Sequence, residues 1–256
     1  MSKPNDSNDS MQQLQTPSNY GFSAVGLDQL GATEYTLATI VVDISGSVQS
    51  YARDLEKCLK TVVEACKSSP RSDNLLIRLV SFNDKIGEIH GFRLLADIDT
   101  KEYDNSLSPY GGTALYDAVM SAAEATGEYG SLLVDQEFMA NGVIYIITDG
   151  CDNSSTATPN SIKNALEKIS KGEKLESLAV ILVMLGYSDS SVKTALDSFK
   201  SSANINQFVD MTDLFANAKP EKQLAKLAGF VSRSISSTSQ ALASGSSSAA
   251  SSQLTF

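Results

Sequence analysis

The sequence contains little cysteine, little histidine and no tryptophan. Its 256 residues include three cysteines and one histidine. Cys58, Cys66 and Cys151 form no C-x-x-C pair and are odd in number, which argues against a disulfide framework. Reduced thiols predict a cytoplasmic location instead. Cys58 and Cys66 fall within one expected helix, where packing is the simpler role for both.

Long apolar runs and basic residues are also scarce. The longest apolar run, 178–185, is far too short to span a bilayer, and residues 1–20 lack the apolar core of a secretory signal. The formal net charge is −10 and the sequence pI is about 4.6. Nucleic acids and anionic membranes require a basic surface, so we expect neither as a partner. The acidic balance fits simple solubility or a surface that attracts cations.

Two polar ends flank the part of the sequence that can fold. Residues 1–19 are rich in Ser, Asn, Asp and Gln and are expected to form a disordered leader. Residues 236–256 are almost entirely Ser and Ala and are expected to form a flexible tail. Hydrophobic residues make up 42% of the chain, as in a globular protein. One folded domain over residues 20–235 follows from the remaining length.

Apolar strands alternate with helical periodicity along this domain. The patterns predict strands at 35–43, 75–82, 85–92, 143–149, 178–185 and 207–210, and helices at 48–67, 115–127, 162–169, 192–199 and 222–235. Strands that are continuously apolar are buried on both faces, which is typical of a parallel sheet between two helical layers. We therefore predict an α/β fold: a three-layer, doubly wound, mostly parallel sheet. The 85–92 arm supplies one antiparallel strand, expected at an edge.

Oxygen-bearing side chains gather where two of these strands end. The run TIVVD ends at Asp43 and continues into Ser45 and Ser47, and VIYIITD ends at Asp149. A glycine-rich loop between them carries Thr113. Carboxyl ends of parallel strands share one edge of the sheet, where open α/β sheets bind their ligands. Residues i, i+2 and i+4 of an extended segment face one side, so these hard oxygens predict a site for Mg²⁺, with Mn²⁺ or Ca²⁺ also possible.

Simpler interpretations exist for each of these residues. Ser45 or Ser47 can cap the helix that follows, and Thr113 can cap the helix at 115. Asp149 followed by glycine can be a plain turn at the end of a strand. The metal interpretation depends on all five residues occurring in one order.

That order resembles the metal-ion-dependent adhesion site of von Willebrand factor A domains. The motif is D-x-S-x-S at residues 43–47, then a threonine after a double glycine, then an aspartate in Thr148-Asp149-Gly150. The resemblance covers about residues 33–235 and implies a doubly wound sheet with one antiparallel edge strand. It implies that the two serines and Thr113 bind the metal directly or through water, and that the aspartates complete the shell.

Residues beside these loops make a second set, and the resemblance also suggests a subfamily. Side chains and backbone next to the metal, or facing a partner, are expected at Gly46, Gly112, Asp117, Gly150 and Asp152, and Asp117 can equally lie on a solvated helix face. The polar leader and Ser-rich ending are similar to intracellular bacterial A-domain proteins, some of which occur in stress or tellurite-resistance gene clusters.

Catalysis is not expected from this sequence. Haloacid-dehalogenase phosphatases carry a second Asp two residues after the first, where this chain has Ser45. A serine hydrolase needs a histidine base, but His90 falls on the 85–92 arm, away from the carboxyl-end loops. No G-x-x-x-x-G-K-[ST] phosphate loop occurs.

Two carboxylates neutralise a divalent ion and leave it able to bind one more anionic ligand. The expected function is therefore Mg²⁺-dependent protein binding, in which the partner supplies an acidic side chain. The alternative is a structural component of a larger or self-associated complex, in which the metal stabilises the loops. The oligomeric state is left open.

Overall fold

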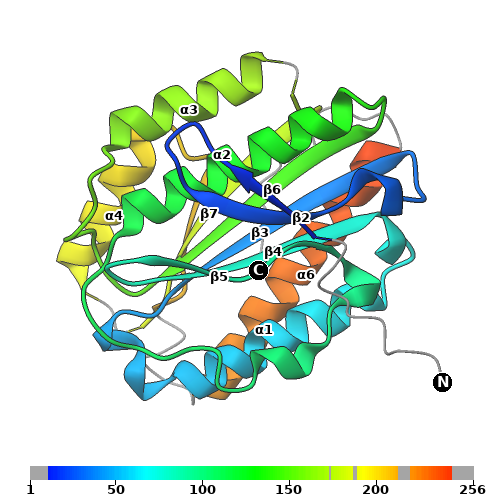
Figure 1. The fold of residues 1–256 in the computed structure, drawn as a ribbon. Helices are drawn as coiled ribbons and strands as arrows, with labels where there is room; N and C mark the ends of the chain where they lie inside the picture. The colour runs from blue at the N-terminus through cyan, green and yellow to red at the C-terminus, as the bar shows by residue number, and fades with distance from the viewer. Residues whose placement is uncertain (1–10, 173, 187–188, 213–219, 244–256) are drawn as a thin grey trace.

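The computed structural model describes residues 11–172, 174–186, 189–212 and 220–243. Their eight strands form one sheet in the order β1-β2-β5-β4-β3-β6-β7-β8. Figure 1 shows α2, α3 and α4 on one face of the sheet and α1 and α6 on the other. The predicted α/β class, with three layers and a mostly parallel sheet, is confirmed.

The six predicted strands and the five predicted helices occur in the predicted order with shifted ends, and two strands that were not predicted, β1 and β2, precede them. The strands are β1 (Met11–Gln15), β2 (Gly21–Val25), β3 (Glu34–Asp43), β4 (Leu75–Phe82), β5 (Ile86–Leu94), β6 (Met139–Thr148), β7 (Ser177–Met184) and β8 (Gln207–Asp210). The helices are α1 (Ala52–Lys67), α2 (Leu115–Val134), α3 (Pro159–Lys171), α4 (Ser190–Ser202) and α6 (Pro220–Ala243). None of the described helices is long and apolar enough to cross a membrane.

The central strand β3 explains why the sheet is mostly parallel. Every residue of β3 after Glu34 is buried, and the strand pairs in parallel with both β4 and β6. Alternate side chains such as Ile40 and Val41 enter separate apolar clusters on the two faces. Both faces of β3 are thus covered, which requires helices above and below it.

The antiparallel edge of the sheet lies elsewhere than the sequence predicts. β5 pairs antiparallel with β4, as expected, but it is an inner strand. The edge is β1, which pairs antiparallel with β2. The disordered leader predicted for 1–19 is therefore wrong over Met11–Gln15, where Leu14 packs against the core and overrides the polar composition. Residues 1–10 lie outside the described part of the chain.

The last helix also continues into a segment predicted to be flexible. α6 runs to Ala243, so the tail expected for 236–256 begins as helix, and 244–256 lie outside the described residues. Small polar side chains hold this end in place. Thr238 and Ser239 are buried, and the Ser239 hydroxyl accepts a hydrogen bond from Arg71 at 3.1 Å. Serine composition alone misses these contacts.

An ion pair with a buried arginine joins β4 to β5, and its carboxylate also binds β2, which pairs with β5 at a single backbone position. Arg78 on β4 is fully buried, and its Nε donates to Glu88 Oε2 at 2.7 Å. The other Glu88 oxygen accepts from the backbone N–H of Ser23 on β2 at 2.9 Å. One carboxylate thus pairs with a buried cation and accepts a strand N–H, and it adds a contact between β2 and β5 where their ladder is short.

Removing this carboxylate should destabilise the fold strongly. Glu88→Ala leaves Arg78 buried and unpaired, so we expect a loss of roughly 3 kcal/mol in the free energy of unfolding. Glu102→Ala is the matched control, because Glu102 pairs with Arg93 in an ion pair that is open to solvent and costs less than about 1 kcal/mol to break. Urea denaturation measures both. Equal losses would contradict the role given to Glu88.

Candidate metal centre

Three loops meet at the carboxyl edge of the sheet. The first loop (44–51) follows β3, the second loop (109–114) precedes α2, and the third loop (149–158) follows β6. Hydrogen bonds join them pairwise. The Tyr110 N–H donates to the Ile44 carbonyl at 3.0 Å. The sheet topology therefore brings the first loop beside the third, although Ser47 and Asp149 are 102 residues apart in the chain.

Asp43 is the buried centre of this region. It is only 1% exposed, and both its oxygens accept hydrogen bonds. Oδ1 accepts from the Ser45 backbone N–H at 2.7 Å, and Oδ2 accepts from the Thr148 hydroxyl at 2.6 Å. Burial raises the pKa of Asp43, the hydrogen bonds oppose that rise, and the neighbouring Asp149 charge adds to it.

Two hydroxyls connect the first loop to the third. The Ser45 and Ser47 hydroxyl oxygens are 3.0 Å apart, and Ser47 Oγ donates to Asp149 Oδ1 at 2.7 Å. The other Asp149 oxygen accepts from the Tyr51 hydroxyl at 2.8 Å. Burial, and then the Asp149 carboxylate, raises the pKa of Tyr51, so this hydroxyl stays protonated and remains a donor. Ser47 is exposed and Asp149 half-buried, so the cluster opens toward solvent.

The helix-cap interpretation of the hydroxyls is wrong. Ser45 precedes a short 3-10 turn, but its side chain makes no capping hydrogen bond. α1 begins later than predicted, and its N-cap residue is Tyr51. α2 has Ala114 at its N-cap, and no side chain caps it from that position. In the hydrogen bonds of the described residues, Thr113 takes part through its backbone alone.

Backbone contacts place Thr113 beside the other two loops. Its N–H donates to the Asn153 side chain at 2.7 Å, and its carbonyl accepts from the Asn153 N–H at 2.9 Å. Thr113 is 5% exposed. The structure thus joins Asp43, Ser45, Ser47 and Asp149 through side chains, and attaches Thr113 to the third loop through its backbone.

The three glycines of the second set serve the loop backbones. The Gly46 N–H donates to a carbonyl of the second loop at 3.3 Å. The Gly112 N–H donates to Asp84 Oδ1 at 2.8 Å, and a Cβ at Gly112 would collide with that carboxylate. The Gly150 carbonyl accepts from Thr148 Oγ1 at 3.1 Å. A Cβ would have room at Gly46 and Gly150, so close approach explains the glycine at 112 alone.

The two aspartates of the second set attach the third loop to α2. Asp152 Oδ1 accepts the Tyr116 N–H at 3.2 Å, so it caps the start of α2 from another segment. Asp117 makes the converse contact, from α2 to the third loop. Its carboxylate accepts the backbone N–H groups of Thr156, at 3.1 Å, and Ala157, at 2.7 Å. Both contact the loops; neither contacts the five predicted ligands in the described hydrogen bonds.

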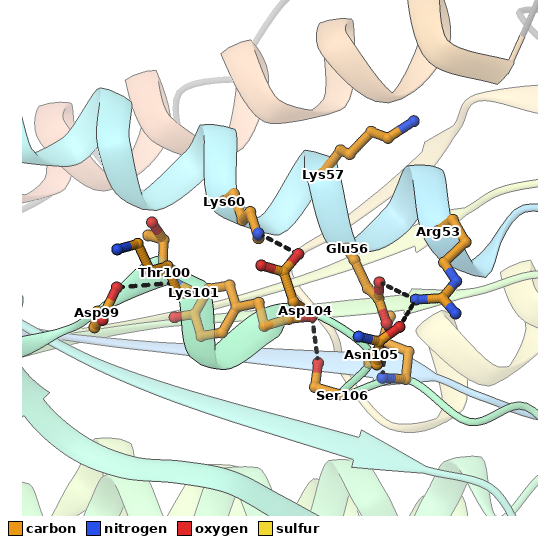
Figure 2. Close-up of polar contacts among 12 residues, drawn as sticks. Arg53, Glu56, Lys57, Lys60, Asp99, Thr100, Lys101, Asp104, Asn105 and Ser106 are labelled. Carbon is orange, nitrogen blue, oxygen red and sulfur yellow. Dashed lines mark hydrogen bonds and ion pairs between the residues drawn. The ribbon is translucent and has the colours of Figure 1, made fainter.

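The crossover, the segment 95–108 between β5 and the second loop, forms hydrogen bonds and an ion pair with α1. Figure 2 shows Lys60 of α1 paired with Asp104 of the crossover. Buried Glu56, also on α1, accepts the Leu107 N–H at 3.1 Å. α1 follows the serines, and the crossover precedes Thr113, so these contacts hold two sides of the site at a fixed separation.

Several residues of the site escape sequence reasoning. Thr148, Tyr51, Asn153 and Asp84 each bond to a site loop or a predicted ligand. Thr148 precedes Asp149 and could be found from its place at the strand end. The others come from helix, turn and loop positions whose proximity depends on the folded arrangement.

The remaining titratable candidate does not belong to this site. His90 is buried on β5, where its Nε2 lies 2.8 Å from the Tyr103 hydroxyl and its Nδ1 2.9 Å from the Gly91 carbonyl. Burial lowers the pKa of His90 to about 4. A neutral histidine with both nitrogens bonded has a packing role, as expected.

The donor set fits a hard divalent cation. Asp43 and Asp149 place two carboxylates near each other, one of them buried, and like charges at such a site favour a bound cation. Ser45, Ser47 and Thr113 add neutral oxygens of the kind that Mg²⁺ prefers. No described group of three or more His, Cys, Asp and Glu side chains could hold a metal, so a cation here depends on the hydroxyls.

A three-layer α/β domain with a D-x-S-x-S loop at the carboxyl edge defines a class of protein. The family profile of the von Willebrand factor type A domain matches residues 39–223, which is more than half of the chain. The chain therefore belongs to this family, whose domains commonly mediate metal-dependent protein–protein interactions. No curated protein matches the sequence.

Solved structures with the same fold include a minor pilin, a pilus adhesin and a thread matrix protein. The PilB minor pilin of Streptococcus sanguinis is 16% identical with a TM-score of 0.54, and the match covers 86% of this chain and 65% of that one. Proximal thread matrix protein 1 of the mussel byssus is 19% identical with a TM-score of 0.51, covering 80% and 47%. The pilus adhesin SpaC of Lactobacillus rhamnosus GG is 12% identical with a TM-score of 0.52, covering 89% and 34%. This chain therefore matches less than two thirds of each, and the likeness shows the fold.

The Thr148 hydroxyl should stabilise the protein even in EDTA. Thr148→Val removes a donor to the buried Asp43 carboxylate, so we expect a loss of roughly 2 kcal/mol in the free energy of unfolding. Thr36→Val is the matched control, because the buried Thr36 hydroxyl has no partner among described residues and its loss should be neutral or stabilising. Guanidinium denaturation measures both. Similar losses would contradict a special contact at Asp43.

Proposed function

We propose that this chain is a Mg²⁺-dependent protein-binding module. Ser45, Ser47 and Thr113 would hold the cation, with Asp43 and Asp149 completing its shell. Mn²⁺ or Ca²⁺ could substitute. The observation that carries the proposal is how the three hydroxyls are used. The Ser45 and Ser47 hydroxyls bond to each other, and Ser47 also donates to Asp149. Among the described residues Thr113 forms hydrogen bonds through its backbone alone, and none of the three hydroxyls caps a helix.

The chemistry of the site favours an acidic ligand from the partner. Two carboxylates balance the charge of a divalent ion, and the three hydroxyls add none. Because Mg²⁺ requires octahedral coordination, the five side chains would leave one position open, which a further carboxylate from an Asp or Glu side chain would fill. Ser47 is exposed and Asp149 is half-buried, so that ligand can approach from solvent.

The rim of the site offers a contact beyond the charge. Tyr110, in the second loop, is 60% exposed and is one of two large hydrophobic side chains exposed in the described part of the chain. The other, Met139, lies at the start of β6, at the opposite edge of the sheet. Exposed tyrosines contribute strongly to protein interfaces, so we place the partner over Tyr110 and the cation together.

We propose binding rather than catalysis. Ser45 occupies the position where a phosphatase of the Asp-nucleophile class carries its acid/base. The one histidine is buried on β5 with both ring nitrogens bonded, so it is not available as a base for either serine. A null assay with phosphate esters and Mg²⁺ is expected.

An assembly role is the second candidate. The relatives in fold are a minor pilin, a pilus adhesin and a thread matrix protein, all of which belong to larger structures by name. In that case the cation would stabilise the loops, and the ligand would come from another copy of this chain. A cytoplasmic location and a stress-related role remain predictions from the sequence.

Peptide selection tests the binding function without knowledge of the partner. Random peptides displayed on phage would be selected on the immobilised full chain in Mg²⁺ and released with EDTA. The recovered sequences should share an Asp or Glu, and recovery should fall at least about tenfold with Thr113→Ala. Thr61→Ala is the matched control, because its exposed hydroxyl bonds only to the Lys57 carbonyl within α1. If the amount of recovered phage changed neither with EDTA nor with Thr113→Ala, the proposal would be refuted.

The mass of the purified chain separates the two candidates. Light scattering in Mg²⁺ and in EDTA should give the same mass for a binding module. Oligomers that appear with Mg²⁺ and are lost with Thr113→Ala would favour the assembly role instead.

A further inference from the structure

The two oxygens of the Asp149 carboxylate have different neighbours. Oδ1 accepts from Ser47 Oγ at 2.7 Å, and Ser47 Oγ lies 3.0 Å from Ser45 Oγ, so this oxygen is next to the proposed cation ligands. Oδ2 accepts from the Tyr51 hydroxyl at 2.8 Å. Ser47 is exposed, whereas Tyr51 is only 7% exposed. One oxygen of Asp149 therefore faces the site, and the other faces a buried phenol.

Tyr51 is held in place by both its backbone and its ring. Its N–H donates to the Val48 carbonyl at 3.0 Å. Its carbonyl accepts the N–H groups of Asp54 and Leu55, each at 3.0 Å, because it is the N-cap residue of α1. The ring belongs to the same buried apolar cluster as Val48 and Leu55. The hydroxyl therefore cannot follow the Asp149 carboxylate if that carboxylate rotates, and the bond between them would break instead.

The second oxygen of Asp149 depends on this one phenol. Among the hydrogen bonds of the described residues, Tyr51 is the donor to Oδ2. The oxygens of Asp43 are bonded differently, by the Ser45 backbone N–H and by the Thr148 hydroxyl at the end of β6. Removing the phenol would therefore free one oxygen of Asp149 and leave both oxygens of Asp43 bonded.

The number of oxygens that a carboxylate supplies decides how many positions a cation has left. Mg²⁺ requires near-octahedral coordination, whereas Ca²⁺ takes more oxygens and accepts both oxygens of one carboxylate. In the proposed site each of the five side chains would supply one oxygen, which leaves one octahedral position for the carboxylate of the partner. If Asp149 bound the ion through both oxygens, it would fill that position itself.

We propose that Tyr51 determines the specificity of the cation site by limiting Asp149 to one metal-binding oxygen. The limit keeps a position open for the partner and favours Mg²⁺ over Ca²⁺. Tyr51 is a positioning residue, because it acts through the carboxylate that it bonds. The inference rests on the proposed function, since it concerns the same cation site.

Calorimetric titration of the full chain with Mg²⁺ and with Ca²⁺ tests this role. Tyr51→Phe keeps the buried ring and removes the hydroxyl, so the variant should fold. We expect the ratio of the Mg²⁺ to the Ca²⁺ association constant to fall at least about fivefold, because Asp149 can then give Ca²⁺ both oxygens. A purely structural role for Tyr51 would instead weaken both ions alike and leave the ratio unchanged.

Tyr129→Phe is the matched control. Tyr129 is buried on α2 in the other apolar cluster, and its hydroxyl donates to the Val25 carbonyl at 2.8 Å. The variant therefore loses one buried phenol hydrogen bond that is remote from Asp149. Its ratio of Mg²⁺ to Ca²⁺ association constants should remain that of the wild type.

Infrared difference spectra of Ca²⁺ binding give a second readout. A carboxylate that binds an ion through both oxygens shows a smaller separation between its antisymmetric and symmetric stretching bands than one that binds through a single oxygen. The Ca²⁺-loaded Tyr51→Phe chain should show this smaller separation, and the wild type and Tyr129→Phe should not.

The outcomes separate this inference from the proposed function. If Tyr51→Phe behaved like Tyr129→Phe in either measurement, the role of Tyr51 would be overturned, and the proposed function would stand. A wild-type chain that binds neither ion would overturn the proposed function, and the inference with it.

Discussion

The buried carboxylate of Asp43 is the constraint on which the rest of the site depends. It ends the central strand at 1% exposure, and one of its oxygens takes a hydrogen bond from the first loop and the other from the end of β6. Burying a charge is costly unless it is bonded and balanced. The Ser45 and Thr148 donors meet part of that cost, and a divalent cation would meet the remainder. The loops around Asp43 are arranged to keep that balance.

The same constraint explains how the outer elements are arranged. Glu56 of α1 accepts a hydrogen bond from the crossover, and this contact helps to keep the first and second loops together. The third loop closes the site from the other side, where Asn153 and Asp152 satisfy the start of α2. A helix start left without partners would expose several N–H groups. Here the loop that carries Asp149 supplies the acceptors for these N–H groups. The same contacts therefore cap the helix and hold the loop in the site.

Sequence patterns predicted the sheet because its strands are continuously apolar, and they predicted the five candidate ligands because strand ends converge. They failed where short polar segments fold through distant contacts. Leu14 packs β1 against the core in a segment whose composition is typical of disorder. Ser239 is buried and accepts a hydrogen bond from Arg71, which lies in another part of the chain. The helix-cap interpretation failed for a related reason: the hydroxyl of Ser47 is within reach of Asp149, a partner that local sequence does not reveal.

Thr113 gives the most direct test of the cation site. Among the described residues it forms hydrogen bonds through its backbone alone, so Thr113→Ala should leave the free energy of unfolding in EDTA almost unchanged. Isothermal titration of the full chain with Mn²⁺ should show one ion per chain, and the variant should bind it at least about tenfold more weakly. Equal Mn²⁺ affinity in the two proteins would contradict the account, since the threonine would then have no part in holding a cation.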